Sequence, residues 1–114
     1  MGHSDNWPDE LDALIAAPEY HSLLMENEQV RVLDTHIPAG KITPIHTHRW
    51  PGSLYILSWS DCVRRDAEGK VLVDSRNSQS PAEESAVWSP QLPPHTLENV
   101  GDKELHLISV EIKS

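Results

Sequence analysis

The stretch Gly40-Lys41-Ile42-Thr43-Pro44-Ile45-His46-Thr47-His48 places two histidines one residue apart at the end of an extended segment. In a strand, residues i and i+2 project from the same face, so the imidazoles of His46 and His48 lie side by side, roughly 6 to 7 Å apart along the backbone. Such a pair is a natural chelate for a divalent metal ion. Because His-x-His occurs in many strands by chance, the pair alone is a weak signal.

A second block strengthens the metal hypothesis. The segment Pro90-Gln91-Leu92-Pro93-Pro94-His95-Thr96-Leu97-Glu98-Asn99 has His95 five residues after Pro90 and Asn99 four residues after His95. Together the blocks resemble the two motifs of the cupin superfamily. The first motif runs Gly, five residues, His-x-His, three or four residues, Glu, six residues, Gly. The second runs Pro-x-Gly, two residues, His, three residues, Asn. The resemblance extends from about residue 28 to the end of the chain.

This resemblance implies an all-β fold, an antiparallel jelly-roll β-barrel, with a divalent metal held by His46, His48 and His95. The sequence departs from the motifs where the first glutamate is expected, because those positions hold Gly52 and Ser53. Trp59 and Leu92 replace motif glycines. Three neutral imidazoles leave the metal its full charge and leave about three coordination positions open. Cysteine dioxygenase and acetylacetone dioxygenase, which are cupins, use such a three-histidine shell for Fe(II).

The rest of the chain fits a barrel preceded by a short helix. Leu11, Leu14 and Ile15 recur at helical spacing, with Asp5 or Asn6 as the cap, Pro8 in the first turn and Pro18 at the end. We therefore expect an N-terminal segment over 1–27 and a barrel over 28–114. Short β-rich runs separated by turns predict the strands, at 30–37, 42–48, 54–59, 62–65, 71–74, 86–88, 95–99 and 104–112.

Bulk composition bounds the class of protein. The chain has 114 residues, enough for one domain, and a formal charge of −9 with no basic run, which disfavours nucleic-acid binding. The single cysteine, Cys62, fits a reducing cytoplasm. No apolar run approaches ~18 residues, and the N-terminus lacks the apolar core of a signal peptide. A chain this short buries limited surface, so we expect a homodimer.

Four further residues are candidates for binding a small-molecule substrate or ligand. Arg49 has a guanidinium that matches a carboxylate, and Tyr55 and Trp88 are aromatic residues at strand positions. His106 shares strand parity with Ile108, which predicts that it points inward. Trp59 is a third aromatic candidate for lining the pocket, but its odd parity relative to His46 and His48 favours a position facing away from the metal. His21 is expected to lie in solvent. For His106 and His36, a hydrogen-bonded role in the barrel wall remains the alternative.

Two functional hypotheses stay open. One is a metal-dependent enzyme resembling the three-histidine Fe(II) dioxygenases, acting on a small chelating metabolite. The other is a binding or sensing module without turnover, whose metal is structural or anchors a ligand. Fe is the preferred metal in the first case, and Zn, Ni or Mn are alternatives. Isomerase chemistry with a histidine base and a tyrosine acid is disfavoured, because strand parity puts His46 and Tyr55 on opposite faces.

Overall fold

The computed structural model describes residues 7–113, which form nine strands, one helical turn and two short 3-10 turns. The helix α1 spans Ala13–Ala16, and the 3-10 turns span Asp9–Leu11 and Ser75–Asn77. The strands are β1 His21–Glu26, β2 Val30–Ile37, β3 His46–His48, β4 Gly52–Ser58, β5 Cys62–Asp66, β6 Val71–Asp74, β7 Ala86–Ser89, β8 Leu92–Asn99 and β9 Leu105–Ile112. None of the helices within these residues is long and apolar enough to cross a membrane.

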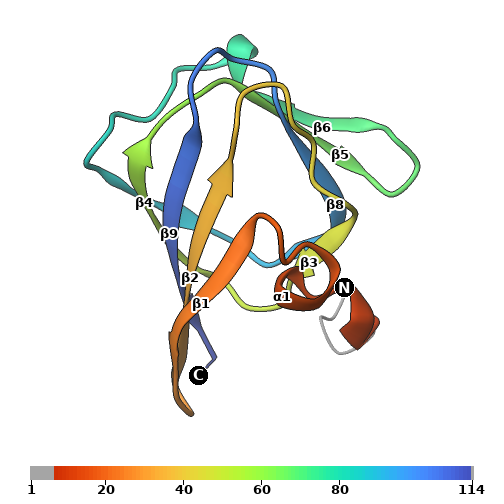
Figure 1. Cartoon of the computed structure of the whole chain (residues 1–114), viewed down its shortest axis with the longest axis vertical. Helices are drawn as coiled ribbons and strands as arrows, with labels where there is room; N and C mark the ends of the chain where they lie inside the picture. The colour runs from red at the N-terminus through yellow and green to blue at the C-terminus, as the bar shows by residue number, and fades with distance from the viewer. Residues whose placement is uncertain (1–6, 114) are drawn as a thin grey trace.

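Two antiparallel sheets face each other to form the barrel (Figure 1). The larger sheet has the order β1-β2-β9-β4-β7, and the smaller has the order β3-β8-β5-β6. The order is not sequential, because the chain crosses repeatedly between the sheets, as a jelly roll requires. The predicted all-β jelly roll with a short N-terminal helix is therefore confirmed.

Strand alternation sorts the larger sheet into an inner and an outer face. In β2 every second residue is buried, and these residues lie opposite the buried residues of β9 in the pairs Arg31–Glu111, Leu33–Ser109, Thr35–Leu107 and Ile37–Leu105. Large apolar side chains occupy one end of the barrel, where Ile37, Ile56 and Leu105 form its closed core. The charged pair Arg31–Glu111 lies at the other end of these strands, where the barrel opens toward β3.

The N-terminal segment belongs to the barrel more closely than its sequence suggests. The expected caps Asp5 and Asn6 lie outside the described residues. In the structure Asp12 caps α1, because its carboxylate accepts a hydrogen bond from the Leu14 amide. The segment after the helix forms β1, which pairs with β2 along the edge of the larger sheet. Residues within the expected 1–27 segment therefore contribute a strand to the sheet.

Candidate metal centre and adjoining cavity

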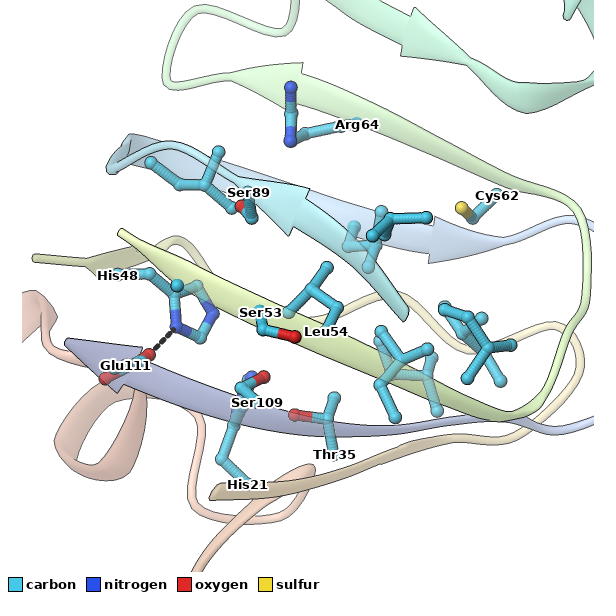
Figure 2. A pocket seen from close by; sticks show the side chains of 18 of the residues that line it. His21, Thr35, His48, Ser53, Leu54, Cys62, Arg64, Ser89, Ser109 and Glu111 are labelled. Atoms are coloured by element: carbon cyan, nitrogen blue, oxygen red, sulfur yellow. Dashed lines mark hydrogen bonds and ion pairs between the residues drawn. The ribbon is translucent and has the colours of Figure 1, made fainter. Parts of the chain in front are cut away.

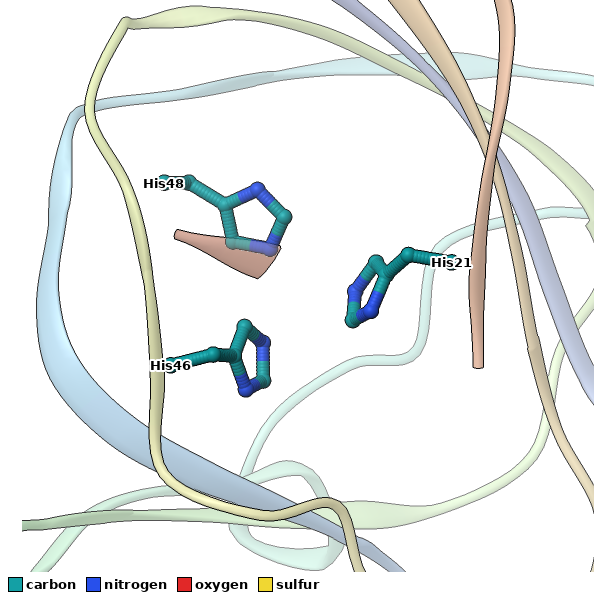
Figure 3. Close-up of side chains that lie close together, drawn as sticks. All are labelled: His21, His46 and His48. Carbon is teal, nitrogen blue, oxygen red and sulfur yellow. The ribbon is translucent and has the colours of Figure 1, made fainter. Parts of the chain in front are cut away.

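Four imidazoles converge at the open end of the barrel. His46 and His48 come from β3, His95 lies directly opposite His46 on β8, and His21 begins β1. The ring centroid of His46 lies 4.4 Å from that of His95, 4.8 Å from that of His21 and 5.1 Å from that of His48. Figure 3 shows His21, His46 and His48 projecting toward a common centre from two sides. His21, His46 and His95 are buried, and His48 is nearly so.

The orientations of His46 and His95 follow from a shared local sequence, a proline two residues before the histidine. Nδ1 of His46 lies 2.8 Å from the Pro44 carbonyl oxygen, and Nδ1 of His95 lies 2.7 Å from the Pro93 carbonyl oxygen. Because a carbonyl oxygen can only accept, Nδ1 carries the proton in both rings and Nε2 carries the lone pair. Each ring is therefore fixed with its ligand nitrogen directed away from the backbone.

His48 is oriented by a chain of charged groups that reaches the N-terminal helix. Its Nδ1 donates to Oε2 of Glu111 at 2.8 Å, and Oε1 of Glu111 accepts from Nε of Arg31 at 2.8 Å (Figure 2 shows the first contact). The guanidinium of Arg31 then binds both carboxylate oxygens of Asp12 at 3.0 Å. Carboxylates placed behind a histidine in this way fix its tautomer and raise its basicity as a metal ligand.

His21 is the site residue that sequence reasoning missed. It was expected in solvent, but it is buried, and its Nδ1 donates to the Ala17 carbonyl oxygen at 3.0 Å. The reason is the pairing of β1 with β2, which sets His21 opposite Thr35 on the inner face. No motif marks this histidine, so only the inclusion of β1 in the sheet reveals it.

Burial keeps these rings neutral. Removal from solvent lowers the pKa of His21 to about 3, with smaller contributions from His48 and His46. Burial likewise lowers the pKa of His48 to about 3 and that of His95 to about 2, and it lowers the pKa of His46. A neutral imidazole is the form that binds a metal ion.

The donor set fits a divalent transition metal. His21, His46 and His48 each offer a ring nitrogen, and these atoms all lie within 4.8 Å of one another. His95 packs against His46 at the same end of the barrel. Imidazole nitrogens suit Fe, Ni, Cu and Zn, whereas Mg and Ca prefer oxygen. Four imidazoles with Nδ1 already hydrogen-bonded present Nε2 as the remaining ligand atom.

Gly52, one of the two positions where the motif glutamate is expected, has no room for a side chain. Gly52 is buried in β4, and a Cβ there would collide with the Val110 carbonyl oxygen of β9. Glu111 lies directly across the sheet from Gly52. Its carboxylate contacts the rear nitrogen of His48, so it supports a ligand from behind.

A cavity of about 230 Å³ extends from the histidines into the barrel. Its floor is apolar, formed by the closed core around Ile56 and Leu105, and Ser89 and Ser109 line its sides (Figure 2). Ligand pockets for drug-sized molecules measure about 300 to 1,000 Å³, so this one suits a small metabolite.

Trp59 lines this cavity, where it packs against the apolar core around Ile37, Ile56 and Leu105. The pairing of β4 with β9 shifts register between Ile56 and Ser58, so an extra residue enters the strand. A bulge of this kind reverses the alternation beyond it.

Asn99, the last residue of the second sequence block, is structural, because its side-chain amide donates to the carbonyl oxygens of Ile37 and Lys103.

None of the four predicted substrate-binding residues lines the cavity. Arg49 is engaged by Asp9, with its Nη2 2.7 Å from the carboxylate. Tyr55 and Trp88 lie on the outer face of the larger sheet, with 40% and 66% of their surfaces exposed. The register of β2 and β9 buries the residues of β9 on either side of His106, so His106 also points outward.

His106 forms a separate cluster on that outer face. Its Nε2 lies 2.7 Å from Oδ1 of Asp34, and its ring stacks on His36 with centroids 3.7 Å apart. The alternative of a hydrogen-bonded histidine in the barrel wall therefore describes its contacts better.

No protein-family model matches the sequence, and no curated protein matches it. The fold, however, is that of cupins. A cupin domain from Bordetella pertussis superposes with a TM-score of 0.65 at 21% identity, covering 82% of this chain and 92% of that one. An RmlC-like cupin with a double-stranded β-helix fold from Methanocaldococcus jannaschii gives 0.57 at 16%, covering 81% and 77%. The DMSP lyase DddQ from Ruegeria pomeroyi gives 0.54 at 13%, covering 85% and 49%.

These likenesses establish the class of fold, a cupin-type double-stranded β-helix. The fold alone does not define a reaction, because one barrel hosts many chemistries. The function must therefore be argued from the histidines and the cavity.

Proposed function

We propose that this protein is a metal-dependent cupin that takes a small metabolite into its barrel beside a divalent ion. His46 and His48 hold the ion, together with His95 as the sequence motifs indicate and His21 as the geometry indicates. The observation that carries the proposal is the common orientation of these rings. Each has Nδ1 directed at an oxygen acceptor. Nε2 of each ring therefore points away from the oxygen that holds Nδ1.

Such a metal supplies Lewis acidity and, in the case of Fe(II), redox chemistry with dioxygen. The surrounding chain supplies position and exclusion of water. Glu111 holds the ring of His48 in place, and the apolar floor of the cavity keeps the far side of a bound molecule dry. Neutral histidines add no negative charge, so an anionic or chelating substrate is not repelled.

We favour Fe(II) dioxygenase-like chemistry over acid–base chemistry by the chain itself. Among the described residues that line the cavity, Glu111 is the one carboxylate, and it is ion-paired with Arg31. Burial raises the pKa of the Cys62 thiol to about 11, so it is not a ready nucleophile. Tyr55, the acid that an isomerase would need, lies outside the cavity. Reactivity must therefore come from the metal.

The lack of a free acid or base among the described cavity residues also supports the second candidate, a binding or sensing cupin. A cavity without a free acid or base serves as a receptor if the resident metal is redox-inert, such as Zn. In that case the metal anchors a ligand and no turnover follows.

Metal analysis followed by oxygen uptake separates the candidates. Untagged protein is assayed for bound metals, then loaded with Fe(II) and given a panel of thiols, diketones and enediols. The proposal expects one metal per chain and substrate-dependent oxygen uptake that is lost in His46→Ala. Bound metal without uptake identifies the binding module, and absence of stoichiometric metal in both native and loaded protein refutes both candidates.

We also propose a homodimer formed through the outer face of the larger sheet, where Tyr55 and Trp88 are exposed. A cluster of large apolar side chains on a sheet face favours association. Sedimentation at micromolar concentration is expected to give a dimer for the native chain and a monomer for Trp88→Glu. A native monomer at all concentrations contradicts this proposal.

The cytoplasmic location expected from the sequence is also a prediction.

A further inference from the structure

Arg64 has no carboxylate partner within residues 7–113, although the protein is strongly acidic. The chain contains five arginines and has a formal charge of −9. Four of the five form ion pairs: Arg31 with Asp12 and Glu111, Arg49 with Asp9, Arg65 with Glu98, and Arg76 with Asp74. Between residues 7 and 113, no acidic side chain pairs with Arg64. Its Nε is buried and has no hydrogen-bond partner there.

Strand alternation explains why Arg64 and its neighbour differ. Arg65 projects from the outer side of β5 and reaches Glu98 on β8 at 2.8 Å. Arg64 projects inward, on the face that carries its cross-strand neighbours Leu97 and Val73, both of which line the cavity. Figure 2 shows Arg64 on β5, on the wall opposite Ser109 and Glu111 of β9.

The environment of the Arg64 guanidinium disfavours an isolated charge. Burial lowers the pKa of Arg64. Glu111, the one carboxylate among the described lining residues, is already paired with Arg31. An unpaired charge removed from water lowers stability unless something compensates it. An arginine kept in such a place is typical of a site completed by a ligand.

Arg64 also lies where the cavity opens. It lines the main cavity of about 230 Å³ and a neighbouring pocket of about 130 Å³, which is walled by Leu72 and Pro90. His95 lines both spaces as well. The charge of Arg64 acts on the rings of His48 and His95, contributing to the lowered pKa of each. The cation and the histidines therefore face one shared space.

We propose that Arg64 anchors the carboxylate of a small, otherwise apolar organic acid, whose remainder occupies the cavity beside the histidines. The guanidinium offers two parallel N–H donors, a geometry that matches a carboxylate. The apolar floor accepts a short hydrocarbon body. This inference rests on the proposed function and adds a substrate class to it. It assigns to Arg64 the carboxylate-binding role that the sequence suggested for Arg49.

The test compares an acid with its neutral isostere in metal-free and metal-loaded protein. Trp50 and Trp59 line the cavity, so their fluorescence reports binding. The probes are 3-methylbutanoate and 3-methylbutanamide, with inorganic phosphate and sulfate as additional anions. We expect the acid to bind at least about tenfold more tightly than the amide, because hydrogen bonds to charged groups are the stronger ones. We also expect that Arg64→Gln abolishes this preference.

Arg65→Gln is the matched control, since it removes an adjacent positive charge that faces outward. This variant should keep the native preference for the acid. Thermal unfolding adds a readout that separates binding from structure. Ligand-free Arg64→Gln is expected to unfold at the same temperature as the native chain or higher, because an uncompensated charge is removed.

Four results overturn the inference. Three of them are failure of 3-methylbutanoate to bind at millimolar concentration, equal loss of acid binding in the two arginine variants, and unfolding of Arg64→Gln well below the native temperature. Phosphate or sulfate binding as well as the acid also overturns it, because a general anion site needs no apolar cavity. Arg64-dependent acid binding to a protein that takes up no metal supports this inference while refuting the metal centre.

Discussion

Glu111 serves two partners at once, since one carboxylate oxygen accepts from His48 and the other from Arg31. Burial raises the pKa of Glu111, and Arg31 opposes that shift. Glu111→Gln removes the negative charge behind the imidazole and keeps a similar volume. Groups behind a ligand commonly account for 10- to 100-fold in metal affinity, so we expect a loss of about that size in competition with a chelator. Glu98→Gln, on the outer side of β8, is the control, and equal affinities in both variants contradict the account.

Cys62 provides a test of the cavity as a dry environment. Burial is the main cause that raises the pKa of this thiol to about 11. Because the thiolate is the reactive form, alkylation by iodoacetamide should be slow at pH 8 and should accelerate only as pH rises well above 9. Mass spectrometry of the native protein over a pH series measures this. Rapid alkylation at pH 8, at the rate seen in urea, would show that Cys62 is exposed.

Single residues differ in how much of their role the sequence reveals. His46, His48 and His95 were predicted as ligands from the resemblance of two sequence blocks to the cupin motifs, and all three rings meet at one end of the barrel. Their role in binding metal stays a prediction. His21 and Glu111 were not foreseen, because their places depend on strand pairing between segments that are far apart in the chain. The position of Arg64 was not foreseen for the same reason, since nothing in the dipeptide Arg64-Arg65 indicates which side chain faces inward.

At the scale of elements, α1 acts as a strap that ties the N-terminal segment to the candidate metal centre. Asp12 caps the helix and binds Arg31, which in turn holds Glu111. Asp12→Ala removes a cap and leaves Arg31 with one partner. We expect the free energy of unfolding to fall by about 2 to 4 kcal/mol, measured from the urea midpoint at an unchanged slope.

Asp9→Ala is the control for the strap, because the Asp9 side chain is 84% exposed and pairs only at the surface with Arg49. Exposed pairs contribute little, so this variant should lie within about 0.5 kcal/mol of the native chain. If the two aspartate variants are equally stable, the strap has no energetic role.

The strands show where alternation succeeds and where it fails as a guide. It holds in β8, where Glu98 projects to the outer side and pairs with Arg65. It does not extend to Trp59, because β4 contains a bulge before this residue that the sequence does not indicate. It also failed for β9, whose outer face carries Ile108 and Val110, so hydrophobicity alone pointed to the wrong side. Inner positions of β9 include Ser109 and Glu111, which belong to the cavity.

At the scale of the whole molecule, the fold was the most predictable feature. The series of short strands predicted an antiparallel barrel or sandwich, and the resemblance of the two histidine blocks to the cupin motifs narrowed this to a jelly roll. The expected limit between residues 27 and 28 did not anticipate β1, because its exposed Leu23, Leu24 and Met25 give no clear pattern. The cavity could not be predicted, because its shape depends on both sheets together.

Binding of a metal to the folded state alone should stabilise the entire domain. At about 100-fold excess over its dissociation constant, a ligand adds about 2.7 kcal/mol. For a chain of this size we expect Zn(II) to raise the melting temperature by about 10 °C or more, reversibly on adding chelator. Mg(II) should have no effect, because it prefers oxygen ligands. Equal effects of the two ions would indicate binding to surface carboxylates instead.

X-ray absorption spectroscopy of Zn(II)-loaded protein tests the convergence of the imidazoles most directly. We predict one ion per chain, with nitrogen or oxygen ligands at about 2.0 to 2.1 Å, no sulfur, and scattering from at least three imidazole rings. His46→Ala and His48→Ala should lose the ion or its imidazole signal, whereas His106→Ala should keep both. A native protein that holds no stoichiometric ion, or an ion with fewer than two imidazoles, would contradict the proposed centre.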